Sequence, residues 1–280
     1  MPSILQVEGG HPLHGEITVR GAKNFVPKAM VASLLADTPS ELYNVPLIRD
    51  TDVVSNLLSL HGVEIDFDQD RGTLRMDTSN VKIASRSDID TLAGASRIPI
   101  LFCGPLLHQL GEAFIPELGG CAIGGRPIDF HLDTLRKFGA IIDKQPDGVH
   151  IKRPSTGLHG AIIELPFPSV GATEQTLLTA VRNEGITTLK GAAIEPEILD
   201  LINVLQKMGA IISVDTDRTI RIEGVAKLTG YRHTALPDRI EAASWGAAAL
   251  ATHGDIYVRG AHQPDMTTFL NTFRKVGGAF

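Results

Sequence analysis

The chain has 280 residues and a formal net charge of −6, with 43% hydrophobic and 21% charged residues, as in an ordinary globular protein. The negative charge argues against a general nucleic-acid-binding protein, which would present a basic face. No apolar run is long enough for a membrane span and the N-terminus lacks a signal-peptide pattern, so we expect a cytoplasmic protein of two domains, with no membrane partner.

Four helical segments along the chain share one ending. Each has an apolar helical pattern that closes on a glycine, the usual left-handed C-cap. These glycines are Gly62, Gly139, Gly209 and Gly277, at intervals of 77, 70 and 68 residues. After the first three, alternating apolar residues flank turn residues, which predicts hairpins. The hairpins cover residues 63–76, 140–151 and 210–222.

Ahead of each glycine-capped helix the pattern predicts a strand and, earlier, a buried alanine-rich helix. The strands lie at 42–45, 113–115, 187–189 and 256–258, and the helices at 27–35, 95–107, 172–181 and 241–252. Short strands lead into three of these helices, at 15–19, 160–165 and 231–235. Each unit therefore reads βαβαββ, a repeat that must pack against sister copies. Four units begin and three are completed, so we expect a chain that stops within its fourth unit.

A glycine-rich segment at 117–129 carries Cys121, with Arg126 five positions later. Each glycine costs about 1 kcal/mol relative to alanine inside a helix, so a loop that brings its backbone near a ligand is favoured. The guanidinium would favour the thiolate and could hold a phosphate. The alternative is a turn with a small buried cysteine, and the segment alone does not decide. The other cysteine, Cys103, lies in an apolar run and is interpreted as a core residue.

Four segments, at repeat-matched positions, carry a resemblance. They are Gly21-Ala22-Lys23-Asn24, the loop 119–126, Phe167-Pro168-Ser169-Val170-Gly171-Ala172-Thr173-Glu174 and Leu236-Pro237-Asp238-Arg239-Ile240-Glu241. In this order they resemble the UDP-N-acetylglucosamine 1-carboxyvinyltransferase family of enolpyruvyl transferases, from about residue 5 to the C-terminus. The resemblance implies an α/β fold of six βαβαββ units in two inside-out α/β barrel domains, with the active site in the cleft between them.

The same resemblance implies a division of the chain. Residues 22–229 would form a catalytic-loop domain of three units, and residues 1–21 would join residues 230–280 in a partial second domain. Six units of about seventy residues correspond to roughly 420 residues, so about a third would be absent. A separate chain that supplies those units is therefore an expected candidate partner.

The family transfers the enolpyruvyl group of phosphoenolpyruvate to the 3'-hydroxyl of UDP-N-acetylglucosamine and releases phosphate, the first committed step of peptidoglycan precursor synthesis. By resemblance, Cys121 is the proton donor, able to form a covalent adduct and open to alkylation by fosfomycin. The residues expected to bind phosphoenolpyruvate are Lys23, Asn24 and Arg126. Those expected to bind UDP-N-acetylglucosamine are Arg97, Arg126, Pro127, Ile128, Asp129, Phe130, Ser169, Val170 and Gly171. Neither a cofactor nor a metal is expected. His11, His14, His131, His150 and His159 are scattered, and each is interpreted as a surface or satisfied polar residue rather than a metal ligand.

Structural roles remain open for three of these residues. Lys23 could be an exposed lysine at a helix start, although the helix dipole disfavours a cation there and so favours an anionic ligand. Arg97 could snorkel at a helix end. Ser169 could be an N-cap, which is compatible with ligand binding.

Activity of this chain alone is a separate question. The family's general base and several arginines belong to the fifth and sixth units, so we expect little or no turnover. A non-catalytic UDP-sugar-binding remnant is the first alternative. A 5-enolpyruvylshikimate-3-phosphate synthase is less favoured, because that sister family lacks the cysteine loop and the Gly-Ala-Lys-Asn sequence.

Overall fold

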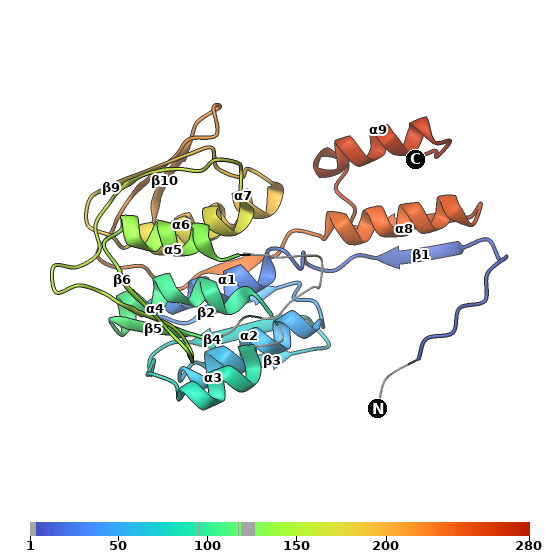
Figure 1. Cartoon of the computed structure of the whole chain (residues 1–280). Coiled ribbons are helices and arrows are strands. Elements are labelled where there is room, and N and C mark those ends of the chain that lie inside the picture. Colours follow the sequence, from blue (N-terminus) through green and yellow to red (C-terminus); the bar gives the residue numbers. More distant parts are fainter. Residues whose placement is uncertain (1–3, 94–95, 117, 119–126) are drawn as a thin grey trace. The chain divides into compact units, whose positions relative to one another are not determined.

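The computed structural model describes residues 4–93, 96–116, 118 and 127–280. Two compact units divide the chain: unit 1 consists of Met1–Ala22 and Pro237–Phe280, and unit 2 of Lys23–Leu236 (Figure 1). The domain boundaries implied by the resemblance, at 21/22 and 229/230, stay a prediction. Among the described residues, no helix combines the length and apolar composition needed to cross a membrane.

The first repeat of unit 2 contributes two α-helices, a short 3₁₀ helix and three strands of a mixed sheet. Its elements are α1 (Val26–Ala32), η1 (Ser33–Leu35), β2 (Ser40–Tyr43), α2 (Arg49–Leu60), β3 (Glu64–Asp68) and β4 (Thr73–Asp77). The sheet order is β12-β2-β4-β3, in which β12 (Arg232–Thr234) runs parallel to β2. The strand that completes this sheet therefore comes from the far end of the unit's sequence.

The second repeat departs from the expected pattern. Its elements are α3 (Arg86–Ala93), η2 (Ile98–Phe102), α4 (Cys103–Gln109), β5 (Glu112–Ile115), α5 (Asp129–Lys137), β6 (Ile141–Gln145) and β7 (Gly148–Lys152). They form a three-stranded antiparallel sheet of order β5-β7-β6. The alanine-rich helix expected at 95–107 is a 3₁₀ turn followed by a short α-helix. Helix α3 was not predicted, although the Ser85 hydroxyl accepts a hydrogen bond from the Asp88 N–H, a recognisable helix-start signal.

The third repeat matches the expected pattern. Its elements are β8 (Ile162–Glu164), α6 (Val170–Ala180), β9 (Ile186–Lys190), α7 (Pro196–Lys207), β10 (Ile211–Val214) and β11 (Ile220–Glu223). The sheet order is β10-β11-β9-β8, with β8 parallel to β9 and the other pairs antiparallel. Every residue of α6 from Ala172 to Ala180 is buried, as is every residue of α1. Helices buried all round lie inside their domain, which is the inside-out arrangement expected from the resemblance.

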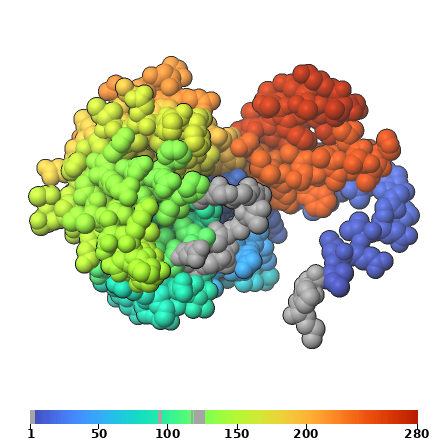
Figure 2. All heavy atoms as spheres, in the orientation of Figure 1, coloured from blue at the N-terminus to red at the C-terminus, as the bar shows by residue number. Residues whose placement is uncertain are grey.

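Unit 1 is built from both ends of the chain. It holds β1 (His14–Thr18), α8 (Arg239–Ala251), β13 (Asp255–Arg259), η3 (Gln263–Met266) and α9 (Thr267–Lys275). Strand β1 pairs parallel with β13, so the N-terminal segment is held by the last repeat. A small core of Val19, Ala242 and Met266 joins these elements, and residues 237–280, orange to red, form one continuous surface (Figure 2).

The glycine-capped helices are confirmed in all four repeats. The backbone φ angles of Gly62, Gly139, Gly209 and Gly277 are 84°, 93°, 106° and 98°. These values lie in the left-handed region, where a side chain would be strained, so glycine is required by the turn that follows each helix. The three predicted hairpins are likewise confirmed as β3–β4, β6–β7 and β10–β11.

Candidate functional site

The start of α6 is a capped helix N-terminus. The Ser169 hydroxyl accepts a hydrogen bond from the Ala172 N–H at 3.3 Å, so Ser169 is the N-cap. The Thr173 hydroxyl donates to the Ser169 carbonyl and accepts from the Ala193 N–H at 3.0 Å, which ties this turn to the segment before α7. The first amides of such a helix, which begins Val170-Gly171, suit an anionic group.

Close packing of α5 on α6 explains the glycine at position 171. A Cβ atom there would lie 2.8 Å from Nε2 of His131 on α5, closer than real contacts allow. His131 is in turn 3.4 Å from the side-chain oxygen of Gln175 on α6. Burial, reinforced by the charge of Arg97, lowers the pKa of His131 to about 4 against the opposing effect of the Gln175 hydrogen bond. His131 is therefore neutral near pH 7, a satisfied polar residue as predicted.

Arg97 joins the start of η2 to the start of α5. Its Nη2 donates to the Pro127 carbonyl at 3.3 Å. Three residues after Pro127, Phe130 meets Phe167 edge to face, with ring centroids 5.3 Å apart and planes at 78°. Three of the segments predicted to bind the UDP-sugar, at 97, 127–130 and 169–171, are thus brought together in unit 2.

A hollow of about 440 Å³ opens beside these residues. Arg97, Pro127 and Ile128 line it, with the β6–β7 turn on another wall. That turn contributes Asp147, whose pKa is lowered mainly by a hydrogen bond from His150. The hollow combines a guanidinium with apolar surface, a combination that suits a ligand with both anionic and flat apolar parts.

Lys23 and Asn24 lie directly ahead of α1, and both are exposed. The Lys23 ammonium is 3.2 Å from the carboxylate of Asp50 in the first turn of α2. Asp50 offsets the unfavourable position of a cation near a helix start. The ion pair with Asp50 is a structural role for Lys23, in addition to its predicted role in binding phosphoenolpyruvate.

A buried ion pair was missed by the sequence analysis. Lys28 on α1 and Glu174 on α6 are 8% and 3% exposed, and their charged groups are 3.6 Å apart. Burial raises the pKa of Glu174 to about 7, with Lys28 opposing the shift and Glu197 and Glu195 adding to it. The available signal was a single charged residue in each of two otherwise uncharged helical segments.

Cys121 and Arg126, the two residues on which the predicted chemistry depends, lie outside the described residues. Asp238 lies in unit 1 and is the N-cap of α8, where its carboxylate accepts from the N–H groups of Ile240 and Glu241. Within the described ranges, no three His, Cys, Asp or Glu side chains are grouped so as to hold a metal.

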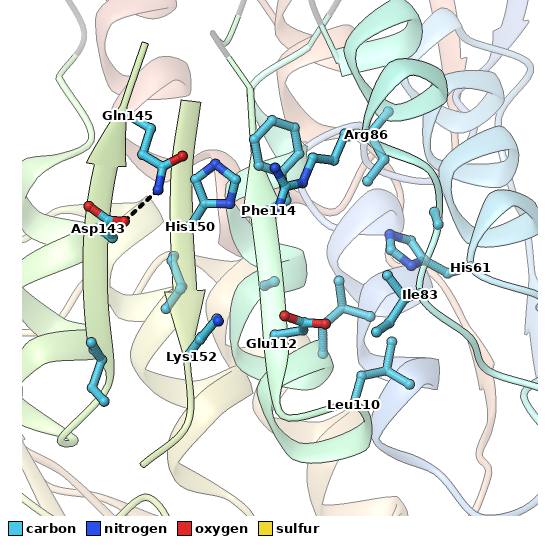
Figure 3. A pocket seen from close by; sticks show the side chains of 16 residues that line it. His61, Ile83, Arg86, Leu110, Glu112, Phe114, Asp143, Gln145, His150 and Lys152 are labelled. Carbon is cyan, nitrogen blue, oxygen red and sulfur yellow. Dashed lines mark hydrogen bonds between the residues drawn. The ribbon is translucent and has the colours of Figure 1, made fainter. Parts of the chain in front are cut away.

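A second hollow, of about 320 Å³, lies against the sheet of the second repeat. Figure 3 shows Arg86 over the ring of Phe114, 5.6 Å from its centroid, and Gln145 donating to Asp143 at 2.6 Å. Among the residues predicted to bind a substrate, none that the structure describes lines it. Its charged side chains, among them Glu112 and Lys152, carry both signs, so it has no bias toward an anion.

Comparison with known proteins identifies relatives over nearly the whole chain. The profile of the family described as EPSP synthase (3-phosphoshikimate 1-carboxyvinyltransferase) matches residues 7–279. The UDP-N-acetylglucosamine 1-carboxyvinyltransferase of Protochlamydia amoebophila (strain UWE25) is 45% identical over 99% of this chain and 60% of its own length. That of Acidiphilium cryptum (strain JF-5) is 44% identical over 98% of this chain and 64% of its own length. The chain thus spans less than two thirds of the length of these relatives.

Solved structures agree on the fold. The enolpyruvyl transferase NikO from Streptomyces tendae has a TM-score of 0.83 at 23% identity, covering 96% of this chain and 62% of that one. EPSP synthase from Acinetobacter baumannii has a TM-score of 0.74 at 19% identity, covering 95% and 61%. The family profile, the curated relatives and the fold all confirm the resemblance seen in the sequence: the chain belongs to the EPSP synthase (3-phosphoshikimate 1-carboxyvinyltransferase) family of enolpyruvyl transferases.

Proposed function

We propose that the chain belongs to an enzyme that transfers the enolpyruvyl group of phosphoenolpyruvate to the 3'-hydroxyl of UDP-N-acetylglucosamine, with release of phosphate. The relatives at 42–45% identity bear the name of this activity. With it the protein would act in the cytoplasm, in peptidoglycan precursor synthesis. Unit 2 would supply the surface that binds the UDP-sugar.

The observation that carries the proposal is the meeting of Arg97, the start of α5 and the start of α6. Arg97 donates to the Pro127 carbonyl, and the Phe130–Phe167 contact holds the two helix starts side by side. The guanidinium and the free amides at the start of α6 would bind the diphosphate. The apolar surface of Pro127 and Ile128 would face the uracil ring.

The reaction would proceed by addition and elimination. The sugar hydroxyl gives up its proton to a base and adds to C2 of phosphoenolpyruvate while C3 receives a proton, and loss of a proton from C3 together with phosphate restores the double bond. Cys121 would donate the proton to C3, and Lys23, Asn24 and Arg126 would hold the phosphate and carboxylate of phosphoenolpyruvate. These roles come from the resemblance and are part of the proposal.

Binding of UDP-N-acetylglucosamine to the 280-residue chain tests the proposal most directly. Calorimetry should detect binding, and Arg97→Gln should weaken it by about tenfold or more, as expected when one charge-assisted hydrogen-bond partner is removed. Arg136→Gln is the matched control, because Arg136 is exposed on α5 and pairs with Asp133 instead. Failure of the unmodified chain to bind UDP-N-acetylglucosamine would overturn the proposal.

Turnover and thiol chemistry supply a second readout. Phosphate release from the two substrates measures turnover, and binding without release would match the expectation that this chain alone is a UDP-sugar-binding half. Fosfomycin should alkylate Cys121 and leave Cys103 unmodified, because Cys103 is fully buried and burial raises the pKa of its thiol. Peptide mass spectrometry with Cys121→Ser as the control locates the adduct, and one found on Cys103 would contradict this assignment.

A further inference from the structure

The ammonium of Lys28 contacts two segments at once. Its Nζ donates to the Asn24 carbonyl at 2.9 Å and lies 3.6 Å from Oε1 of Glu174. Lys28 belongs to α1, whereas Glu174 lies one turn into α6. A single buried cation therefore connects the start of one helix to the start of another.

The Asn24 carbonyl is oriented by its hydrogen bond from Lys28. The N–H groups of Lys28 and Ala29 both donate to the Phe25 carbonyl, so the helical ladder begins one residue after Asn24. The hydrogen bond from Lys28 then sets the direction of the Asn24 peptide, next to Lys23. Glu174, on the other side of the ammonium, follows Thr173, whose hydroxyl bonds the Ser169 carbonyl at the cap of α6.

Stability alone does not explain a buried pair of this kind. Removing two charges from water costs several kcal/mol per ion, and replacing a buried pair by well-packed apolar residues is often neutral or stabilising. Around Glu174, the start of α7 adds two more carboxylates, Glu195 and Glu197, which raise the cost of its charge. The charges are better explained by the geometry that they impose on the segments they join.

We propose that Lys28 and Glu174 are positioning residues, whose ion pair holds the Lys23–Asn24 segment in a fixed place against the start of α6. For the identity of the ligands this inference rests on the proposed function: Lys23 and Asn24 are its phosphoenolpyruvate contacts and Ser169–Gly171 its UDP-sugar contacts. The pair keeps the two groups of contacts in one geometry while touching neither substrate.

Amide hydrogen exchange without any ligand tests the coupling itself. Glu174→Gln should speed exchange at residues 24–28 of the other helix by roughly tenfold, and Lys28→Met should do the same at residues 170–174. Asp215→Asn is the control, since Asp215 pairs with Arg221 on the surface. Faster exchange confined to the helix that carries the substitution would overturn the inference.

A double variant separates positioning from a structural role. Lys28→Met alone leaves the Glu174 carboxyl buried without its partner, whereas Lys28→Met with Glu174→Gln removes both charges and should recover most of the thermal stability. In the single and the double variant alike, affinity for UDP-N-acetylglucosamine should be about 10- to 100-fold weaker than in the unmodified chain, because the binding groups are misplaced. If the double variant regained affinity together with thermal stability, the ion pair would have a structural role only, and the inference would be overturned.

The two proposals fail in different ways. If the unmodified chain does not bind UDP-N-acetylglucosamine, the proposed function is wrong, and the exchange experiment still decides whether the pair couples α1 to α6. If the unmodified chain binds and the exchange stays local to each helix, the proposed function stands and the positioning role falls.

Discussion

The negative charge of Glu174 is unfavourable because its carboxylate is buried. Burial raises its pKa from 4.5 to about 7 even with Lys28 beside it. An acid whose pKa is raised by folding binds more protons in the folded state than in the unfolded state between those two values. Its contribution to stability is therefore greatest below about pH 4.5 and is lost as the pH rises through about 7.

Glu174→Gln should remove this pH dependence. Urea unfolding between pH 4.5 and 8 should show the variant gaining in free energy of unfolding relative to the unmodified chain as the pH rises. Among the described residues, the charged groups that act on Glu174 are Lys28 of α1 and, at the start of α7, Glu195 and Glu197. Two histidines also contact α6, His131 and His108, and burial lowers the pKa of each to about 4. Asp215→Asn, at an exposed carboxylate, should show no such trend. A constant difference between Glu174→Gln and the unmodified chain would contradict the assignment.

Among the secondary-structure elements, the helices of unit 2 pack so closely that some positions in them can hold only a particular residue type. Helix α4 meets α6 at Gly104, where a Cβ atom would lie 2.2 Å from the Thr179 hydroxyl and 3.1 Å from its Cα. That hydroxyl is buried and donates to the Gln175 carbonyl at 2.7 Å, so it cannot move aside without losing its partner. The α4–α6 contact therefore requires a glycine, although no turn occurs there.

Gly104→Ala tests this packing. Alanine favours a helix by about 1 kcal/mol over glycine, but overpacking against a fixed neighbour costs typically 1–3 kcal/mol. Because the neighbour here includes backbone, we expect the clash to win and the free energy of unfolding to fall by about 1–2 kcal/mol. Gly9→Ala, where a Cβ atom would meet nothing within 4 Å, should change stability little. Unchanged or raised stability of Gly104→Ala would show that α4 and α6 can separate at low cost.

Element prediction succeeded where local chemistry was decisive. The glycine caps and the hairpin turns depend on backbone conformations that few residues adopt, so Gly139 and Gly209 marked their helix ends correctly. The second repeat was the exception. In place of the helix expected at 95–107 it has η2, with Pro99 in its first turn, and then α4 from Cys103, and the Ser85 signal for α3 was not recognised.

At the scale of the whole molecule, two parallel strand pairs join segments that are distant in the sequence. Strand β12 runs parallel to β2 in unit 2, whereas β1 pairs with β13 in unit 1. His233 on β12 is buried, accepts a hydrogen bond from the Lys207 ammonium at Nδ1 and donates from Nε2 to Asp200 at 2.9 Å. Tyr231 donates from its hydroxyl to the Ala29 carbonyl. The segment after residue 229 is thus an integral part of unit 2.

Two truncated chains should distinguish the boundary seen in the structure from the one implied by the resemblance. Residues 23–236 retain β12, His233 and Tyr231 and should unfold cooperatively. Residues 23–229 lose a strand of the first sheet and leave Asp200 without its partner, so they should be less stable by several kcal/mol, as for deletion of buried side chains. Urea unfolding measures both. Equal stability of the two chains would favour the 229/230 boundary.

The sequence by itself determined the repeat, the glycine-capped helices, the hairpins and the family resemblance, because periodicity, caps and turns depend on residues close together in the chain. It also indicated Arg97, residues 127–130 and residues 169–171 as one group, through the resemblance. Only the tertiary structure decided that β12 completes the β2 sheet, that Arg97 reaches the Pro127 carbonyl, and that Lys28 and Glu174 share a buried site. Such contacts join distant segments, and whether a charge is buried depends on everything packed around it.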